Sequence, residues 1–149
     1  MKFYEFINNY DLDDIDIYFD MDGVLAEYDI GNFDYNTIRP LQSIIKKFED
    51  LAKKNVNIKI LTVCNEDKII DEKIIWLNKY LPFFDVKNAI FLSREGIKIS
   101  SEELKSNYLK SNCNDKKITI LIDDDIRIIK CVLKNNENVK VFHISSLID

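Results

Sequence analysis

Short apolar runs alternate along the chain with segments in which apolar residues recur at helical spacing. Five runs predict strands: "IDIYFD" at 15–20, "NIKILTV" at 57–63, "NAIFL" at 88–92, "ITILID" at 118–123 and "VKVFHI" at 139–144. Each run is short and apolar, which favours a buried strand. The alternation of strands with helical segments predicts an α/β fold in which helices pack on a parallel sheet.

The segments between these runs predict helices at 41–52, 67–80, 100–110 and 126–134. Pro40 suits the first turn of the first of these helices, and we expect the second to end before Pro82. Ser100 and Glu103 form a candidate capping box at the start of the third. Apolar residues within 3–10 also have helical spacing, which predicts a short N-terminal helix that docks on the domain.

The composition favours one globular domain. The chain has 149 residues, of which 46% are hydrophobic and 32% charged, a balance that lets a single domain bury its own core. No repeat, linker or low-complexity tract divides the chain, so we expect one domain over residues 1–149. The formal net charge of −5 argues against a large nucleic-acid-binding surface and leaves room only for a local basic groove.

The sequence carries no sign of secretion or of membrane insertion. The N-terminal stretch "MKFYEFINNYDLDD" has acids where a signal peptide has an apolar core, and no apolar run approaches the roughly 20 residues of a membrane span. Cys64, Cys113 and Cys131 are odd in number and lack a metal-binding spacing, which indicates reduced thiols. These features predict a cytoplasmic protein with no membrane partner.

Polar side chains gather where the predicted strands end. They are Asp20 and Asp22 after the first strand, Thr62 in the second, and Asp123, Asp124 and Asp125 at the fourth. In an open parallel sheet, ligands bind beyond the carboxyl ends of the strands. If the first and fourth strands are neighbours, their carboxylates repel one another unless a cation such as Mg²⁺ lies between them. The alternative interpretation is that these aspartates form solvated turns.

These residues and their order resemble the haloacid dehalogenase (HAD) superfamily of phosphohydrolases. "DMDGVLA" at 20–26 is similar to its first motif, "ILT" at 60–62 to its second and "ILIDDD" at 120–125 to its fourth. More narrowly, "RPLQSIIKKFEDLAKK", "DEKIIWLNKYLP" with "NAIFL", and "LKSNYL" before "LIDD" resemble the bacterial and phage 5′(3′)-deoxyribonucleotidase branch. The resemblance implies a three-layer α/β/α sandwich around a Rossmann-like, five-stranded parallel sheet in the order 3-2-1-4-5.

The residue types suit phosphoryl transfer through a covalent intermediate. Asp20 would attack phosphorus and form an aspartyl-phosphate, and Asp22 would act as the general acid and base. Gly23 would let the chain turn after these two aspartates. Thr62 would donate a hydrogen bond to a phosphoryl oxygen, and backbone groups at Gly23 and Val63 would belong to the same anion site.

The resemblance also implies a Mg²⁺ cofactor. The side chains of Asp20 and Asp123 and the backbone carbonyl of Asp22 would hold the ion, which shields the nucleophile from the charge of the phosphate. Asp124 would lie behind these ligands.

A fixed cation is also expected, because the phosphate and the carboxylates together carry more charge than one Mg²⁺ cancels. Lys98, Lys105 and Lys110 are the candidates between the third and fourth strands. We favour Lys105, because it lies in the first turns of the predicted helix and "KSNYL" resembles the third motif of the family. Lys98 precedes that helix, and Lys110 stands at its far end, where a lysine complements the helix dipole in water.

The interval 26–40 is too short for the helical cap domain that relatives acting on small nucleotides insert there. We expect a short flap in its place. Phe33 and Tyr35 of the flap would either stack on a base or, as we favour, pack against the sheet edge. Because such a flap shields the pocket poorly, we expect an open site or a homo-oligomer in which a neighbour covers it.

Several other residues have ordinary structural explanations. His143, the single histidine, lies in the last predicted strand, and we expect it far from the acidic strand ends and outside catalysis. Trp76 belongs to an apolar helix stripe and is expected in the core. Lys46, Lys47, Lys53 and Lys54 are expected on a solvated helix face, and Asp11, Asp13, Asp14 and Asp16 in a solvated loop at the opposite end from the site.

The sequence therefore predicts a Mg²⁺-dependent phosphomonoester hydrolase, most similar to a 5′(3′)-deoxyribonucleotidase, with a small phosphorylated substrate such as a nucleotide. A phosphatase of nucleic-acid ends, or of another bulky phosphomonoester, is the alternative within the enzymes, and nucleic acid is expected only as such a substrate. Two alternatives from other classes are a receiver-like phospho-acceptor module and a catalytically silent interaction protein with the HAD fold.

Overall fold

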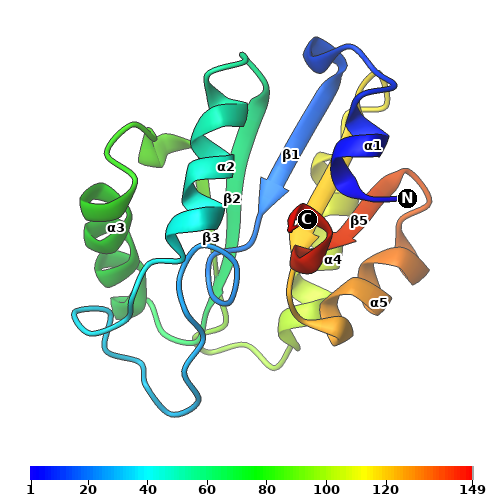
Figure 1. Ribbon diagram of the computed structural model, residues 1–149. Coiled ribbons are helices and arrows are strands. Elements are labelled where there is room, and N and C mark those ends of the chain that lie inside the picture. The colour runs from blue at the N-terminus through cyan, green and yellow to red at the C-terminus, as the bar shows by residue number, and fades with distance from the viewer. Residues whose placement is uncertain (149) are drawn as a thin grey trace.

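The computed structural model, which describes residues 1–148, contains a five-stranded parallel sheet (Figure 1). Its strands are β1 (Ile15–Phe19), β2 (Asn57–Cys64), β3 (Ala89–Ser93), β4 (Ile118–Asp123) and β5 (Val139–His143). They lie in the order β3-β2-β1-β4-β5, and every neighbouring pair is parallel. The predicted fold class and strand order are confirmed, and β1 lies beside β4.

Helices cover both faces of the sheet and complete three layers (Figure 1). One face carries α1 (Phe3–Ile7), α2 (Gln42–Ala52) and α3 (Lys68–Tyr80). The other face carries α4 (Ser101–Asn112) and α5 (Ile126–Asn135). Short 3₁₀ turns occur at η1 (Leu12–Asp14), η2 (Val86–Asn88) and η3 (Ile144–Leu147).

Two clusters of buried apolar side chains hold the layers together. The larger cluster joins Phe19 of β1 to Phe48 of α2 and Trp76 of α3. The smaller cluster joins Tyr18 of β1 to Leu109 of α4. Because consecutive side chains of a strand point to opposite faces, Tyr18 and Phe19 belong to different clusters. Strands covered on both faces have nearly continuous apolar sequences, which explains why the sequence pattern located them.

The helix starts follow the sequence pattern with one exception. Ser100 caps α4, because its hydroxyl accepts a hydrogen bond from the Glu103 N–H at 3.2 Å. Pro40, however, precedes α2 and does not lie in its first turn. Pro40 forms an antiparallel bridge with Ala26, and the Leu41 N–H donates to the Leu25 carbonyl at 2.8 Å. This extended pairing delays the start of the helix.

Residues 26–40, named the flap below, form a loop that contains no helix. The ends of the flap are paired, with the Glu27 N–H donating to the Arg39 carbonyl at 2.9 Å. The flap also contacts α3, where Nε1 of Trp76 donates to the Ile38 carbonyl at 3.0 Å. Trp76 is only 2% exposed, so the prediction that it packs in the core is confirmed.

The N-terminal helix docks beside η3, as the sequence predicted (Figure 1). The Phe3 N–H donates to Oγ of Ser146 at 2.8 Å. The Phe3 ring also packs edge-on against Phe142 of β5, with 5.6 Å between the ring centroids. These contacts join α1 to β5, which is an edge strand of the sheet.

Two further sequence expectations concern the environment of the chain. Within residues 1–148, no helix combines the length and the apolar character needed to cross a bilayer. Cys64, Cys113 and Cys131 are free thiols. Burial raises the pKa of the Cys64 thiol, which therefore stays protonated near neutral pH.

Candidate active site

The carboxyl ends of β1 and β4 bring three carboxylates together. Asp20 follows β1, and its N–H donates to the Ile122 carbonyl of β4 at 2.9 Å. Asp20, Asp123 and Asp124 each offer one carboxylate oxygen, and these oxygens lie within 4.8 Å of one another. Asp20 is 7% exposed and Asp123 is fully buried. The neighbouring strands thus place the first and fourth motifs side by side.

Lys105 of α4 lies between two of these carboxylates. Its Nζ is 2.8 Å from Oδ1 of Asp20 and 2.7 Å from Oδ2 of Asp123, and the residue is 1% exposed. Burial lowers the pKa of Lys105, but the charges of Asp20 and Asp123 outweigh burial and the pKa is raised overall. Lys105 therefore stays cationic. Lys98 and Lys110 are both exposed.

The carboxylate cluster favours binding of a cation. Burial, followed by the negative charge of Asp123, raises the pKa of Asp20 well above its ordinary value. Burial and Asp123 likewise raise the pKa of Asp124. Such groups take up protons unless another positive charge joins them, and a hard divalent ion prefers carboxylate oxygens. The donor set therefore fits Mg²⁺, and it includes the Asp124 carboxylate, which the family resemblance had placed behind the ligands.

The Asp22 carboxylate has hydrogen-bond partners outside this cluster. Its Oδ1 accepts a hydrogen bond from the Tyr35 hydroxyl at 2.6 Å, and its Oδ2 accepts one from Lys73 Nζ at 2.9 Å. Burial, with the charge of Asp22 next, raises the pKa of Tyr35 above its usual range, so the hydroxyl remains a donor. The side chain of Asp22 is 28% exposed and is held between the flap and α3.

Thr62 is also in contact with Lys73. Its hydroxyl oxygen accepts a hydrogen bond from Lys73 Nζ at 2.6 Å, and the Val63 carbonyl accepts another at 3.0 Å. Thr62 is fully buried and Lys73 is 1% exposed. The sequence analysis missed Lys73, although its position gave a clue. It stands three and four residues before the buried Trp76 and Leu77, so a charged side chain occupies the inward face of α3.

Gly23 has a backbone conformation that only glycine adopts readily, with φ of +83°. A Cβ atom at this position would also collide with the Asp124 carboxylate. The turn after Asp22 is therefore built tightly against the carboxylate cluster. Both the dihedral angle and the close approach require the absence of a side chain.

Asp125 stands apart from the cluster, although it continues the acidic run. Its carboxylate caps α5 by accepting the Arg127 N–H at 2.9 Å and forms an ion pair with that side chain at 2.8 Å. The hydrogen bond from Arg127 lowers the pKa of Asp125. Asp125 is thus a helix cap.

The expectation that His143 lies far from the acidic strand ends is wrong. The register of β5 places His143 opposite Asp123, because the two strands are parallel and end at the same edge of the sheet. His143 is nevertheless exposed, and its Nδ1 lies 2.7 Å from Oγ of Ser145. Its observed contacts start the following 3₁₀ turn and do not reach the carboxylates.

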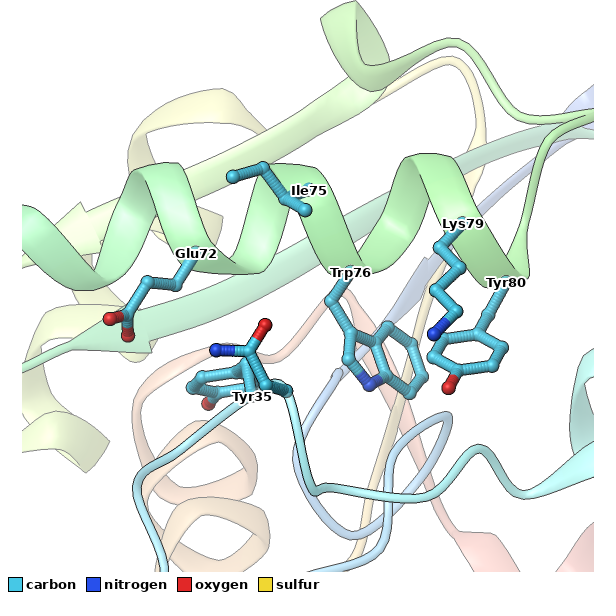
Figure 2. Close-up of a pocket in the computed structure, with 7 residues that line it drawn as sticks. Tyr35, Glu72, Ile75, Trp76, Lys79 and Tyr80 are labelled. Carbon is cyan, nitrogen blue, oxygen red and sulfur yellow. The ribbon is translucent and has the colours of Figure 1, made fainter.

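The two flap aromatics lie in different environments, with Tyr35 partly buried against the larger apolar cluster, as the favoured interpretation expected of both rings. Tyr35 bonds Asp22, and its ring centroid lies 5.8 Å from Lys73 Nζ. Phe33 is 66% exposed and does not pack against the sheet edge. Tyr35 also borders a pocket of about 120 Å³ between the flap and α3. Figure 2 shows the lining side chains of Tyr35, Glu72, Ile75, Trp76, Lys79 and Tyr80.

Comparisons with known proteins show the fold. No protein-family profile and no curated protein sequence matches the chain. The chain is similar to a structure of the Pnkp1/Rnl/Hen1 complex, with a TM-score of 0.65 and 14% identity over 87% of this chain and 45% of that one. A structure of the Pnkp1/Rnl/Hen1 RNA repair complex gives a TM-score of 0.62 and 15% identity over 87% and 42% of the two chains.

A third similar structure is that of D,D-heptose 1,7-bisphosphate phosphatase from B. bronchiseptica, complexed with magnesium and phosphate. It has a TM-score of 0.60 and 10% identity, over 89% of this chain and 94% of that one. The chain spans less than half the length of the first two structures. Together with the strand order, these likenesses define a Rossmann-like α/β fold that the chain shares with these structures.

Proposed function

We propose that this chain is a Mg²⁺-dependent phosphomonoester hydrolase that uses Asp20 as its nucleophile. The observation that carries the proposal is the convergence of Asp20, Asp123, Asp124 and Lys105 where β1 and β4 end. The shared fold supports it, because a structure with this fold is that of a phosphatase complexed with magnesium and phosphate. A buried carboxylate beside a fixed cation also suits attack on an anionic phosphate.

The proposed reaction has two displacements. A carboxylate oxygen of Asp20 attacks phosphorus, an aspartyl-phosphate forms, and the P–O bond to the leaving group breaks while Asp22 donates a proton to the departing oxygen. Water then attacks the phosphorus of the intermediate and gives its proton to Asp22. Inorganic phosphate leaves, and Asp20 is regenerated.

The remaining residues bind and orient the phosphoryl group. Mg²⁺, held by the carboxylates of Asp20, Asp123 and Asp124 with the backbone carbonyl of Asp22, would offset negative charge on the nucleophile and the phosphate. Lys105 neutralises charge beside the same oxygens. The Thr62 hydroxyl and the backbone near Val63 would donate hydrogen bonds to the phosphoryl oxygens, whereas the Gly23 N–H already donates to the Ala26 carbonyl at 2.7 Å.

We propose a nucleotide as the substrate. The pocket between the flap and α3 supports this choice, because the partly buried rings of Tyr35 and Tyr80 line it. Aromatic side chains are the surfaces on which bases stack. The pocket adjoins Tyr35, whose hydroxyl bonds the proposed general acid Asp22, so a group held there would lie close to the leaving oxygen.

A phosphatase of nucleic-acid ends is the second candidate. It is favoured by the flap, which lacks a helix and exposes Tyr28, Ile30 and Phe33 by 67%, 86% and 66%. These side chains offer contact surface to a substrate that extends beyond one nucleotide. Two structures with a similar fold belong to an RNA repair complex, which agrees with this candidate.

A substrate panel with Mg²⁺ separates the candidates. The panel contains deoxynucleoside 5′- and 3′-monophosphates, ribonucleotides, sugar phosphates and 3′-phosphorylated oligonucleotides, with Asp20→Asn as the inactive control. Preference for mononucleotides supports the first candidate, and preference for oligonucleotide ends supports the second. Absence of hydrolysis throughout would refute the phosphatase proposal. Stable phosphorylation of Asp20 would then indicate a phospho-acceptor module, and no phosphorylation an interaction protein.

A further inference from the structure

Lys73 is a buried lysine at the site that the proposed reaction does not yet use. Its Nζ donates to Oδ2 of Asp22 at 2.9 Å, to Oγ1 of Thr62 at 2.6 Å and to the Val63 carbonyl at 3.0 Å. An ammonium group has three N–H donors and no acceptor. The three oxygens therefore match its donors, and none remains for a phosphoryl oxygen while these bonds persist.

We propose that Lys73 is a positioning residue, which orients the general acid Asp22 and the hydroxyl of Thr62. This inference rests on the proposed phosphatase function, since it assigns a role within that reaction. Lys73 reaches both residues from α3, whereas Lys105 reaches the nucleophile from α4 on the opposite face of the sheet. The two buried lysines thus serve different parts of the same site.

The effect on Thr62 follows from hydrogen-bond polarity. Because Lys73 only donates, the Thr62 oxygen must accept in their 2.6 Å contact. The hydroxyl hydrogen of Thr62 therefore points away from Lys73. That hydrogen is then free to donate to a phosphoryl oxygen bound at the end of β2.

The effect on Asp22 follows from the geometry of its two oxygens. The Tyr35 hydroxyl holds Oδ1 at 2.6 Å and Lys73 holds Oδ2 at 2.9 Å. A carboxylate held at both oxygens keeps one orientation, which sets where its proton is delivered when the P–O bond breaks. Loss of Lys73 would leave only the flap contact, and the carboxylate could rotate.

A purely stabilising role explains the arrangement less well. Burying an ammonium group carries a large desolvation cost, which a purely stabilising role does not require. Removing one partner of an ion pair lowers stability, but the Asp22 carboxylate is 28% exposed and keeps its hydrogen bond from Tyr35. We therefore expect Lys73→Met to fold with reduced stability and its catalysis to change. Lys73→Gln, which keeps one donor, serves as a second variant, and circular dichroism with thermal melting checks both.

The test compares two classes of ester. The p-nitrophenolate group leaves readily without a proton, whereas an alkoxide from an alkyl phosphate needs the proton that Asp22 supplies. For Lys73→Met we expect kcat/KM for the alkyl phosphate to fall by about 10²-fold or more. For p-nitrophenyl phosphate we expect a loss roughly tenfold smaller. Tyr35→Phe should also lower kcat/KM more for the alkyl phosphate than for p-nitrophenyl phosphate, because it removes the other hydrogen bond to the Asp22 carboxylate.

Matched variants exclude indirect effects. Lys68→Met removes a lysine from the exposed start of the same helix, where its side chain is 75% exposed, and should leave both rates unchanged. In the double variant Lys73→Met/Asp22→Asn, the preference for the nitrophenyl ester should equal that of Asp22→Asn alone, because residues that act through one another are not additive.

The outcomes separate this inference from the proposed function. If the wild-type protein hydrolyses neither ester, the phosphatase proposal fails and the inference fails with it. If the wild type is active and Lys73→Met reduces both esters equally, the loss is in binding of the phosphoryl group, through Thr62 or through Lys73 itself, and the positioning of Asp22 is overturned. The positioning role would also be overturned if the effects of Lys73→Met and Asp22→Asn added up in the double variant.

Discussion

In the protein without bound metal, two properties of Asp20 oppose each other. It must be ionised to attack phosphorus, yet burial and the charge of Asp123 raise its pKa well above the ordinary value. A carboxyl group whose pKa is higher in the folded than in the unfolded state stabilises the fold while it is protonated. This contribution to the free energy of unfolding is fully present when the pH is below the unfolded pKa, and it is lost as the pH rises through the folded pKa. Without metal, the ionised nucleophile therefore destabilises the fold.

Asp20→Asn should abolish turnover and yet stabilise the metal-free protein. We expect the rate to fall by roughly 10⁴-fold or more, because the nucleophile is removed. In EDTA, urea unfolding should show the variant to be more stable than the wild type at pH 8. The difference should shrink as the pH falls towards 4, where the wild-type carboxyl is protonated. Wild-type turnover in the variant would contradict the covalent mechanism.

Gly23→Ala and Gly31→Ala form a matched pair of variants. Both glycines have positive φ, +83° and +85°, so each alanine should cost about 1–2 kcal/mol of unfolding free energy. A Cβ at position 23 also displaces the Asp124 carboxylate, whereas nothing lies within 4 Å at position 31. When activity is titrated with Mg²⁺, the concentration needed for half-maximal activity should therefore rise in Gly23→Ala and stay unchanged in Gly31→Ala. An equal requirement in both variants would argue against Asp124 as a metal ligand.

The sequence located some site residues better than others. Asp20, Asp22 and Thr62 could be singled out because a polar residue at the end of an apolar strand is conspicuous and the strand ends share one edge. Lys73 was missed because helix lysines are normally solvated, and only its three acceptor oxygens, contributed by β2 and by the turn after β1, explain its burial. The contact of Tyr35 with Asp22 depends on the path of the flap, which no periodic pattern encodes.

Among the elements, α4 determines which lysine reaches the carboxylates. The helix begins at Ser101, so its second turn places Lys105 against the ends of β1 and β4. Lys98 lies in the preceding loop, and Lys110 lies near the opposite end of the helix. The cap at Ser100 therefore fixes the register of the site.

Lys105→Ala should reduce turnover by at least about 10²-fold, because two carboxylates and the phosphate lose a fixed cation. Lys98→Ala and Lys110→Ala serve as controls and should remain near the wild-type rate, since both side chains are exposed. The measurement is kcat with a generic phosphomonoester at saturating Mg²⁺. A crippled Lys98→Ala beside a nearly normal Lys105→Ala would reassign the lysine.

Element positions were predictable where burial imposes a period, and less so elsewhere. The five strands appear within a residue or two of their predicted ranges, because both of their faces are covered. The start of α2 lies within one residue of its predicted position, but Pro40 was wrongly expected in the first turn, because its pairing with Ala26 is a contact between segments that local propensity does not reveal. The same holds for His143, whose distance from the acidic ends depended on the strand register.

On the scale of the whole molecule, Mg²⁺ binding should be linked to folding and to pH. A ligand that binds only the folded state raises stability by about 2.7 kcal/mol at one hundred times its dissociation constant. Protons compete for Asp20 and Asp124, whose pKa values are raised. Metal binding should therefore stabilise the fold more at pH 8 than at pH 5.

Thermal melting with and without Mg²⁺ measures this linkage, with NaCl of equal ionic strength as the control. We expect a shift in Tm that is larger at pH 8 than at pH 5. The shift should be much smaller in Asp123→Asn, which lacks one carboxylate of the cluster. An equal shift at both pH values would show that Mg²⁺ binds elsewhere.

The two buried lysines come from opposite layers of the sandwich, with Lys73 on α3 and Lys105 on α4. Each layer has its own apolar cluster, and the cluster under α4 and α5 is the smaller. Local opening of either layer withdraws one cation from the site while the other layer keeps its helices. Inactivation by heat or denaturant would then precede global unfolding, and substitutions deep in either cluster would weaken catalysis without touching a catalytic residue.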